Sequence, residues 1–347
     1  MVGLDTPWKE QAHALMTKAW KLFDEGDLEG AEEICRRALV TDPESAEAVL
    51  LLGQIRLEHG DPRGAMQRFE QAIEIDPDWA EPYLFAAETA LFDLDDPHSA
   101  VQFATEVVER TDDQTEFVDA LLLKSEALLV IGSKDAIREA REDLRHVPPI
   151  LNDAALCVRA GRVYLDLEEY DPSERYFRQA IACEPGNADA WHGLGCCLEA
   201  KEDHHGMVEA WLKTRELDLK APNPPWSLSD KEFEDVAAAS MDALHPEIRR
   251  LIGNVPVLVR DYPDEDIIRQ GFDPRILGFF MGIPYAEKGT LSGTPPHLDC
   301  ILLFKRNIER AALNKEEAIE EISITLLHET GHFFALSDEQ LEAMGLG

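Results

Sequence analysis

The chain is poor in basic residues. Among its 347 residues, 33 Lys and Arg stand against 69 Asp and Glu, a formal net charge of −36. The part from Lys231 onward has 11 basic and 21 acidic residues, which leaves −26 for the first 230. Because nucleic acids and anionic lipid headgroups attract basic surfaces, this balance argues against both as partners. We expect the acidic surface mainly to confer solubility, and a preference for basic partners is the second interpretation.

Long apolar runs and paired cysteines are also missing. No apolar run approaches the ~20 residues that span a bilayer. Met1 to Asp5 show neither the basic start nor the apolar core of a signal peptide. The six cysteines include no Cys-x-x-Cys pair, and the adjacent Cys196 and Cys197 are interpreted as small buried residues of a helix. We therefore expect a cytoplasmic protein with reduced thiols.

The first two hundred residues repeat with a period of 34. Four pairs of like residues share this spacing: Gly26 and Gly60, Ala31 and Ala65, Ala38 and Ala72, and Pro43 and Pro77. Later copies carry further landmarks: Gly161, Tyr164, Phe177, Ala180 and Pro185 in one, and Trp191, Leu194, Gly195 and Trp211 in the next. The period and these residue types resemble the tetratricopeptide repeat (TPR). The resemblance covers about residues 8–218 and implies roughly six helical hairpins, stacked into a solenoid whose groove binds a protein or peptide.

The helical period ends at a Pro-rich segment, residues 221–225, and the pattern then changes. Ser229 and Glu232 have the spacing of a capping box that starts a helix. Three strand candidates follow: Val255–Val259, Ile276–Phe280 and Leu298–Phe304. Pro256 confines the first of them to an early or edge position. We predict a mainly α chain, with an N-terminal TPR α-solenoid over residues 1–220, a linker over 221–230 and a small α+β domain over 231–347.

One motif near the C-terminal end carries the chemistry. His328, Glu329 and His332 form the pattern H-E-x-x-H. Residues four apart on a helix share a face, so both imidazoles can reach one zinc ion at about 2.0–2.1 Å. Glu329 is offset from that face and is the candidate catalytic base for a water at the metal.

The motif requires a helix beneath it. Asn314 is a candidate N-cap with Glu317 in the capping-box position. Ile322 to Leu326 alternates like a strand. A strand would nevertheless hold the two histidines too far apart to chelate. We therefore predict a helix that continues to Ala335.

A third metal ligand must follow His332, where Asp338, Glu339 and Glu342 supply the carboxylates. A helix that ran on would place residues six or seven positions later about 9–10 Å along its axis, out of reach. Residues 337–340 have the pattern of a second capping box, which predicts a turn at Ala335 and Leu336 before a short helix. Asp338 is the best-placed third ligand. Its alternative role is that of an acid favoured by the helix dipole.

Four segments of the last domain resemble the minimal zincin-like metallopeptidases: Thr325–His332, Leu336–Leu341, Leu303–Arg310 and Val257–Val259. The resemblance covers about residues 231–347. The family pattern H-E-x-x-H-x-x-G-x-x-D implies that His328, His332 and Asp338 bind zinc and that Glu329 is the base. Ala335 replaces the family's glycine, and an alanine with positive φ costs about 1–2 kcal/mol.

These observations predict a zinc-dependent peptidase whose repeats dock a protein or peptide. The alternative is a TPR scaffold whose last domain binds zinc without catalysis, and a third possibility is an adaptor without metal. Structural zinc normally has four protein ligands, so a site with three favours catalysis. An extended substrate is expected to pair with an edge strand, for which residues 298–304 are the candidate. Tyr285 and His297 are candidate oxyanion donors. His204 and His205 point in different directions on a helix or turn and are not expected to bind metal.

Overall fold

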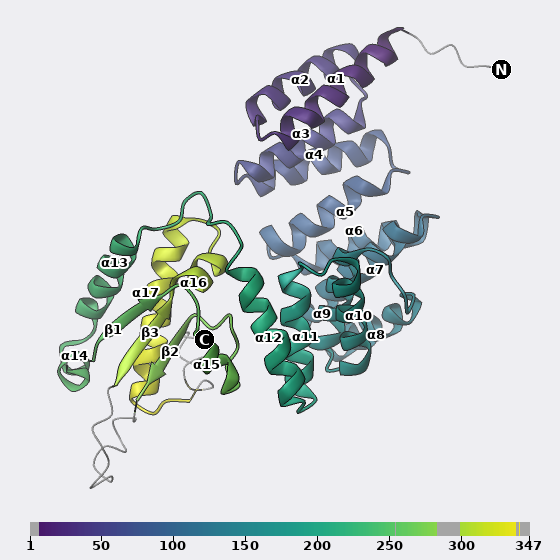
Figure 1. Cartoon of the computed structure of the whole chain (residues 1–347). Helices are drawn as coiled ribbons and strands as arrows, with labels where there is room; N and C mark the ends of the chain where they lie inside the picture. Colours follow the sequence, from purple (N-terminus) through teal and green to yellow (C-terminus); the bar gives the residue numbers. More distant parts are fainter. Residues whose placement is uncertain (1–6, 254, 283–298, 338–339, 341–347) are drawn as a thin grey trace, which may run out of the picture. The chain divides into compact units, whose positions relative to one another are not determined.

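The computed structural model describes residues 7–253, 255–282, 299–337 and 340. The chain divides into two compact units, residues 1–179 and 180–347. Figure 1 labels the α-helices and strands of both. The predicted mainly α fold class, with helical repeats followed by a small α+β domain, is confirmed.

The first unit consists of helices that pair along the chain. They are α1 (Pro7–Asp24), α2 (Leu28–Thr41), α3 (Ala46–Glu58), α4 (Pro62–Ile75), α5 (Ala80–Glu88), η1 (Thr89–Asp93), α6 (Pro97–Arg110), α7 (Gln114–Ile131), α8 (Lys134–Asp143), η2 (Leu144–His146), α9 (Ala154–Asp166) and most of α10 (Tyr170–Cys183). Aspartate or serine side chains cap many of them by accepting a backbone N–H, as Asp61 does from Gly64 at 2.9 Å. The capped starts explain why the helices begin at regular intervals.

Small residues let the two helices of a repeat approach each other. A Cβ atom at Gly53 would lie 2.4 Å from the Phe69 ring, and one at Gly161 would lie 2.8 Å from the Phe177 ring. Both rings are fully buried. The 34-residue spacing therefore reflects a packing rule, in which a glycine on one helix admits the large ring of the next.

The second unit combines two repeat helices with the α+β domain. Its elements are α11 (Ala188–Ala200), α12 (His204–Asp218), α13 (Asp230–Ala243), α14 (Pro246–Ile252), β1 (Val257–Arg260), α15 (Glu265–Arg269), β2 (Gly278–Met281), β3 (Cys300–Phe304), α16 (Lys305–Ala311) and α17 (Lys315–Phe333). The predicted capping box of α13 is confirmed: Ser229 and Glu232 each accept the other's backbone N–H. Helices α14, α15 and α16 are short and were not expected from the sequence.

The sheet has the strand order β1-β3-β2, with β1 parallel and β2 antiparallel to β3. Every residue of β3 is buried, as its continuous apolar sequence requires of a central strand. β1 alternates between half-buried and exposed residues and is an edge strand, as Pro256 indicated. The proposed edge position of residues 298–304 is wrong, because β3 is paired on both sides.

Helices cover the sheet on its two faces. Ile301 and Leu303 pack with residues of α13 and α17, including Phe233 and Leu326. On the opposite face, Leu302 and its neighbours pack with Ile267 of α15. The first of these cores fixes α17 against β2 and β3, which positions the H-E-x-x-H motif.

The segment between α12 and α13 lies against α16. Glu309 is almost fully buried and accepts hydrogen bonds from Ser227 Oγ at 2.7 Å and from Leu228 N at 2.9 Å. Arg306 donates to the carbonyl oxygens of Ala221 and Pro222. The segment between α12 and α13 is thus held near both of its ends by α16. The predicted domain boundaries at 220 and 231 stay predictions. The division into compact units falls elsewhere, after residue 179, and places α11 and α12 in the same unit as the last domain.

None of the helices in the described ranges combines the length and apolar character needed to cross a membrane.

Candidate metal centre

The H-E-x-x-H motif lies in the last turns of α17. The predicted N-cap is confirmed, because Asn314 Oδ1 accepts the backbone N–H of Glu317 at 2.9 Å. The strand-like run from Ile322 to Leu326 is helical, as predicted. Ile322 and Leu326 are four residues apart, and both are fully buried in the core beneath the sheet. Burial of this face overrides the local β preference of the run.

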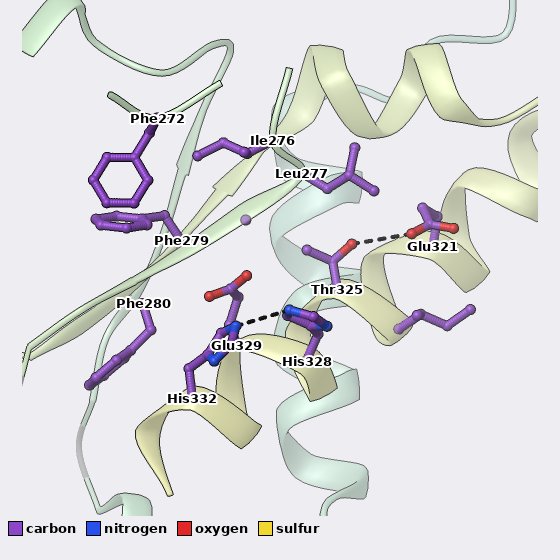
Figure 2. A pocket seen from close by; sticks show the side chains of 12 residues that line it. Phe272, Ile276, Leu277, Phe279, Phe280, Glu321, Thr325, His328, Glu329 and His332 are labelled. Atoms are coloured by element: carbon purple, nitrogen blue, oxygen red, sulfur yellow. Dashed lines mark hydrogen bonds between the residues drawn. The ribbon is translucent and has the colours of Figure 1, made fainter. Parts of the chain in front are cut away.

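The two histidines converge. His328 Nε2 and His332 Nε2 lie 3.0 Å apart, and Figure 2 shows the two rings turned toward each other. Two nitrogens bound to one tetrahedral zinc at about 2.0–2.1 Å lie roughly 3.3–3.4 Å apart. The observed pair therefore needs to move by only a few tenths of an ångström to share an ion. These residues fit a zinc centre.

The backbone sets the tautomer of His332. Its Nδ1 lies 3.1 Å from the carbonyl oxygen of Leu336, which can only accept, so the Nδ1–H donates. The lone pair is then left on Nε2, the nitrogen that faces His328. Metal-binding histidines are commonly oriented by such a bond from the other ring nitrogen.

The bond to Leu336 depends on a sharp end to the helix. α17 ends at Phe333, and Ala335 has a φ of 63°, in the left-handed region. Leu336 N–H donates to Gly331 O at 3.1 Å and Ala335 N–H donates to His332 O at 2.9 Å, the two bonds of a Schellman motif. The predicted turn at Ala335 and Leu336 is therefore confirmed.

The predicted second capping box is also present. Ser337 N–H donates to Gln340 Oε1 at 3.0 Å, and Gln340 N–H donates to Ser337 Oγ at 3.4 Å. Asp338, the predicted third ligand, lies outside the described residues, as do Glu339, Glu342, Tyr285 and His297. The assignments of these five residues stay predictions.

Glu329 is 5% exposed and points toward β2. Its carboxylate and the two histidines offer donor atoms that all lie within 4.8 Å of one another. Gly278 of β2 provides the space, because a Cβ atom there would lie 2.8 Å from Glu329 Cγ and 2.8 Å from Thr325 Cγ2. Gly278 was not singled out from the sequence. Its position inside an apolar strand is the signal that a side chain approaches the backbone closely.

A cavity of about 540 Å³ opens onto these residues. Its walls combine one face of α17 with β2 and the segment before it: Phe272, Ile276, Leu277, Gly278, Phe279, Phe280, Glu321, Ile324, Thr325, His328, Glu329 and His332. Phe280 contacts Phe333 of α17, whereas Phe279 packs on the opposite face of the sheet. Because residues from both faces of β2 line it, the cavity runs along the edge of this strand.

That edge of β2 has free backbone groups within the described part of the sheet. Phe304 N–H donates to Leu277 O at 2.8 Å. Hydrogen-bonded pairs alternate along an antiparallel ladder, so Gly278 and Phe280 direct their N–H and C=O groups away from β3. An extended chain could pair with them beside Glu329.

Of the other histidines considered, His204 and His205 begin α12 and are both exposed. Neither belongs to a group of potential metal ligands among the described residues, and the expectation that they do not bind metal stays a prediction.

Comparison with known families agrees with this geometry. The family profile of the zincin-like metallopeptidases matches residues 252–347, and tetratricopeptide-repeat profiles match residues 22–91, 154–187 and 176–209. The chain carries tetratricopeptide repeats and a zincin-like metallopeptidase domain. Both resemblances inferred from the sequence are thereby confirmed. No curated protein matches this chain.

Solved structures that resemble this chain in fold include two pilus-related proteins. The type IV pilus biogenesis factor PilW is 16% identical, with a TM-score of 0.50 over 60% of this chain and 94% of PilW. Pseudomonas aeruginosa PilF is 17% identical, with a TM-score of 0.50 over 67% of this chain and 100% of PilF. At such identities the likeness shows the helical repeat fold alone.

Proposed function

We propose that this protein is a zinc-dependent peptidase that cleaves an extended polypeptide. The observation that carries the proposal is the convergence of His328 and His332 beside the buried Glu329, at a cavity that runs along a free strand edge. His328, His332 and Asp338 would hold the ion. When bound, zinc supplies Lewis acidity and lowers the pKa of a water in its open position.

The residues of the chain would divide the remaining work. Backbone groups of Gly278 and Phe280 would hold the substrate in an extended conformation, which replaces the earlier candidate strand at 298–304. Glu329 would accept a proton from the attacking water and return it to the leaving amine nitrogen. Phenylalanines at the cavity wall would exclude bulk water, which strengthens electrostatic interactions within the site.

The repeats are proposed to bind a partner or substrate peptide that carries basic side chains. In the first unit, a cavity of about 800 Å³ is lined by residues of the α1, α3 and α5 region: Trp20, Glu44, Ser45, Ala46, Glu47, Ile75, Asp76, Trp79 and Glu81. Trp20 Nε1 donates to Glu47 Oε1 at 2.8 Å. Aromatic faces beside carboxylates suit the aliphatic stem and charged head of Lys or Arg.

The test of the catalytic assignment is Glu329→Gln in the full chain. We expect zinc content to stay at the wild-type value by metal analysis, whereas cleavage of a mixed peptide pool falls at least about a hundredfold, because a general base contributes about 10²–10⁴-fold. Chelation of the wild-type protein should abolish cleavage, and added zinc should restore it.

Other outcomes select the rival functions. Undiminished cleavage by Glu329→Gln would refute the role of Glu329. Stoichiometric zinc with no cleavage by the wild type favours a TPR scaffold with a non-catalytic zinc domain. Absence of zinc from protein purified without chelators favours an adaptor in which His328 and His332 satisfy each other by a hydrogen bond.

A further inference from the structure

A second group of side chains that could hold a metal ion lies in the second unit, apart from the H-E-x-x-H motif. His192 and Cys196 project from α11, and Asp273 lies in the segment between α15 and β2. Each offers one donor atom, and the three atoms lie within 4.8 Å of one another. His192 Nε2 is 2.8 Å from Asp273 Oδ2, and Cys196 Sγ is 4.0 Å from His192 Nε2.

The sequence positions explain the convergence. His192 and Cys196 are four residues apart on a regular helix, the same spacing that brings His328 and His332 together. Asp273 is held from its own side, because the backbone N–H of Arg275 donates to Asp273 Oδ1 at 2.7 Å. The three residues are half-buried, with side-chain exposures of 23% for His192 and 31% for Asp273. An ion there would be partly shielded and still reachable from solvent.

The donor set suits a borderline-soft divalent ion. An imidazole, a thiolate and a carboxylate are all ligands of zinc, and cobalt(II) takes the same geometry.

The competing arrangement is the direct pair of His192 and Asp273, in which His192 Nε2 lies 2.8 Å from Asp273 Oδ2. A metal ion would displace the proton shared in this contact and the thiol proton of Cys196. The ion pair leaves the nearby thiol without a strong bond, since the contacts of Cys196 Sγ to the ring are 3.9 and 4.0 Å long. An ion would engage all three groups.

We propose that His192, Cys196 and Asp273 form a second divalent-metal site, which takes Zn²⁺ and joins α11, the first helix of the last repeat, to the wall of the cavity beside the H-E-x-x-H motif. Phe272 is next to Asp273 in the chain and lines that cavity, where its ring packs on Phe279 at a centroid distance of 4.6 Å. Occupancy of the site would fix the segment that carries both residues relative to α11.

The test uses cobalt(II) as a probe, because a thiolate ligand gives a near-ultraviolet sulfur-to-cobalt charge-transfer band and the H-E-x-x-H motif contains no cysteine. The full-length protein is depleted of metal and titrated with Co²⁺. We expect two equivalents to bind and the charge-transfer band to saturate with one of them. Cys196→Ser should lose the band and one equivalent. The exposed Cys183 supplies the matched control, since Cys183→Ser should keep both.

Variants of the H-E-x-x-H motif distinguish metal binding there from metal binding at the second site. His328→Ala should lose one equivalent and keep the band, and Glu329→Gln should keep both equivalents and the band, whether or not the protein cleaves peptides. A band that is absent from the wild type, or that survives Cys196→Ser, overturns the proposal.

Alkylation in the wild-type protein gives a readout that does not depend on the folding of a variant. Coordination removes the free thiolate that reacts with iodoacetamide, so Zn²⁺ should slow the modification of Cys196 by about tenfold or more. Cys183, read by mass spectrometry in the same sample, should react at an unchanged rate. Equal rates at Cys196 with and without Zn²⁺ would contradict the site.

Discussion

At the scale of single residues, a strained backbone conformation lies next to the candidate metal centre. Ala335 adopts a φ of 63° without the freedom of a glycine. The conformation costs about 1–2 kcal/mol. It persists because the turn allows Leu336 to bond to both Gly331 and the ring of His332. The strained turn therefore maintains the orientation of His332, a proposed zinc ligand.

We expect Ala335→Gly to raise the free energy of unfolding by about 1 kcal/mol, since glycine adopts this φ without steric conflict while losing more backbone entropy on folding. The control is Ala238→Gly on an exposed face of α13, which should lower that free energy by about 1 kcal/mol. Urea unfolding of the metal-depleted proteins measures both. Equal destabilisation by the two substitutions would show that Ala335 is not strained in solution.

Residue-scale features differed in how far they could be predicted. The spacing of His328 and His332 dictates a shared helix face. The glycine-like role of Ala335 was implied by the resemblance to the zincin-like pattern, and the turn itself by the second capping box. The space that Gly278 leaves for Glu329 depends on a contact between segments about 50 residues apart in the sequence. A glycine inside an apolar strand signals a close approach, but no local pattern specifies that Glu329 is the residue that approaches.

At the scale of elements, an acidic residue recurs at the start of the first helix of successive repeats, in α3, α5 and α7. Glu47, Glu81 and Glu116 each lie in the first turn of their helix, at sequence spacings of 34 and 35 residues. The helix dipole favours an acid at this position. Here burial raises the pKa of the Glu81 carboxyl, and the charges of Glu116 and Glu47 raise it further. The acids therefore repel one another, and a cationic ligand would relieve the repulsion.

We predict that a lysine-rich peptide binds the repeats and quenches the fluorescence of Trp20 and Trp79, which line the cavity. Combining Glu47→Gln with Glu81→Gln should weaken binding roughly tenfold at low salt, at up to about 1 kcal/mol for each charge. Raising the salt concentration should reduce the difference. Glu109→Gln, on an exposed face of α6, is the control. Tighter binding of an acidic peptide of equal length would contradict the proposal.

Long elements were predictable and short ones were not. α17 is 19 residues long, begins at an N-cap and has buried residues along one face. α16 has seven residues and begins directly after β3 without a side-chain cap, so no local signal marks it. The central position of β3 depends on its pairing with β1 and β2, which are separated from it in the sequence. Its fully apolar sequence was nevertheless a sign of a strand covered on both faces.

At the scale of the whole molecule, the last repeat and the zincin-like domain share one compact unit. Asp218 of α12 is 2% exposed, and its carboxylate accepts hydrogen bonds from Arg275 at 3.1 and 3.2 Å and from Arg310. Tyr262 Oη donates to the carbonyl oxygen of the same residue at 2.8 Å. Removing one partner of a buried ion pair leaves an uncompensated charge, which costs about 3–5 kcal/mol.

A fragment that begins at residue 231 would lack this aspartate. It would also lack the segment between α12 and α13, which bonds to α16. We expect the fragment 184–347, which keeps α11 and α12, to unfold in one cooperative transition when monitored by circular dichroism. The fragment 231–347 should melt at a lower temperature or without a cooperative transition, because Arg275 and Arg310 lose their shared partner. Asp218→Asn in the full chain should destabilise the second unit in the same direction. If both fragments melt cooperatively at the same temperature, the last repeat is an attachment and not part of the fold that supports the candidate metal centre.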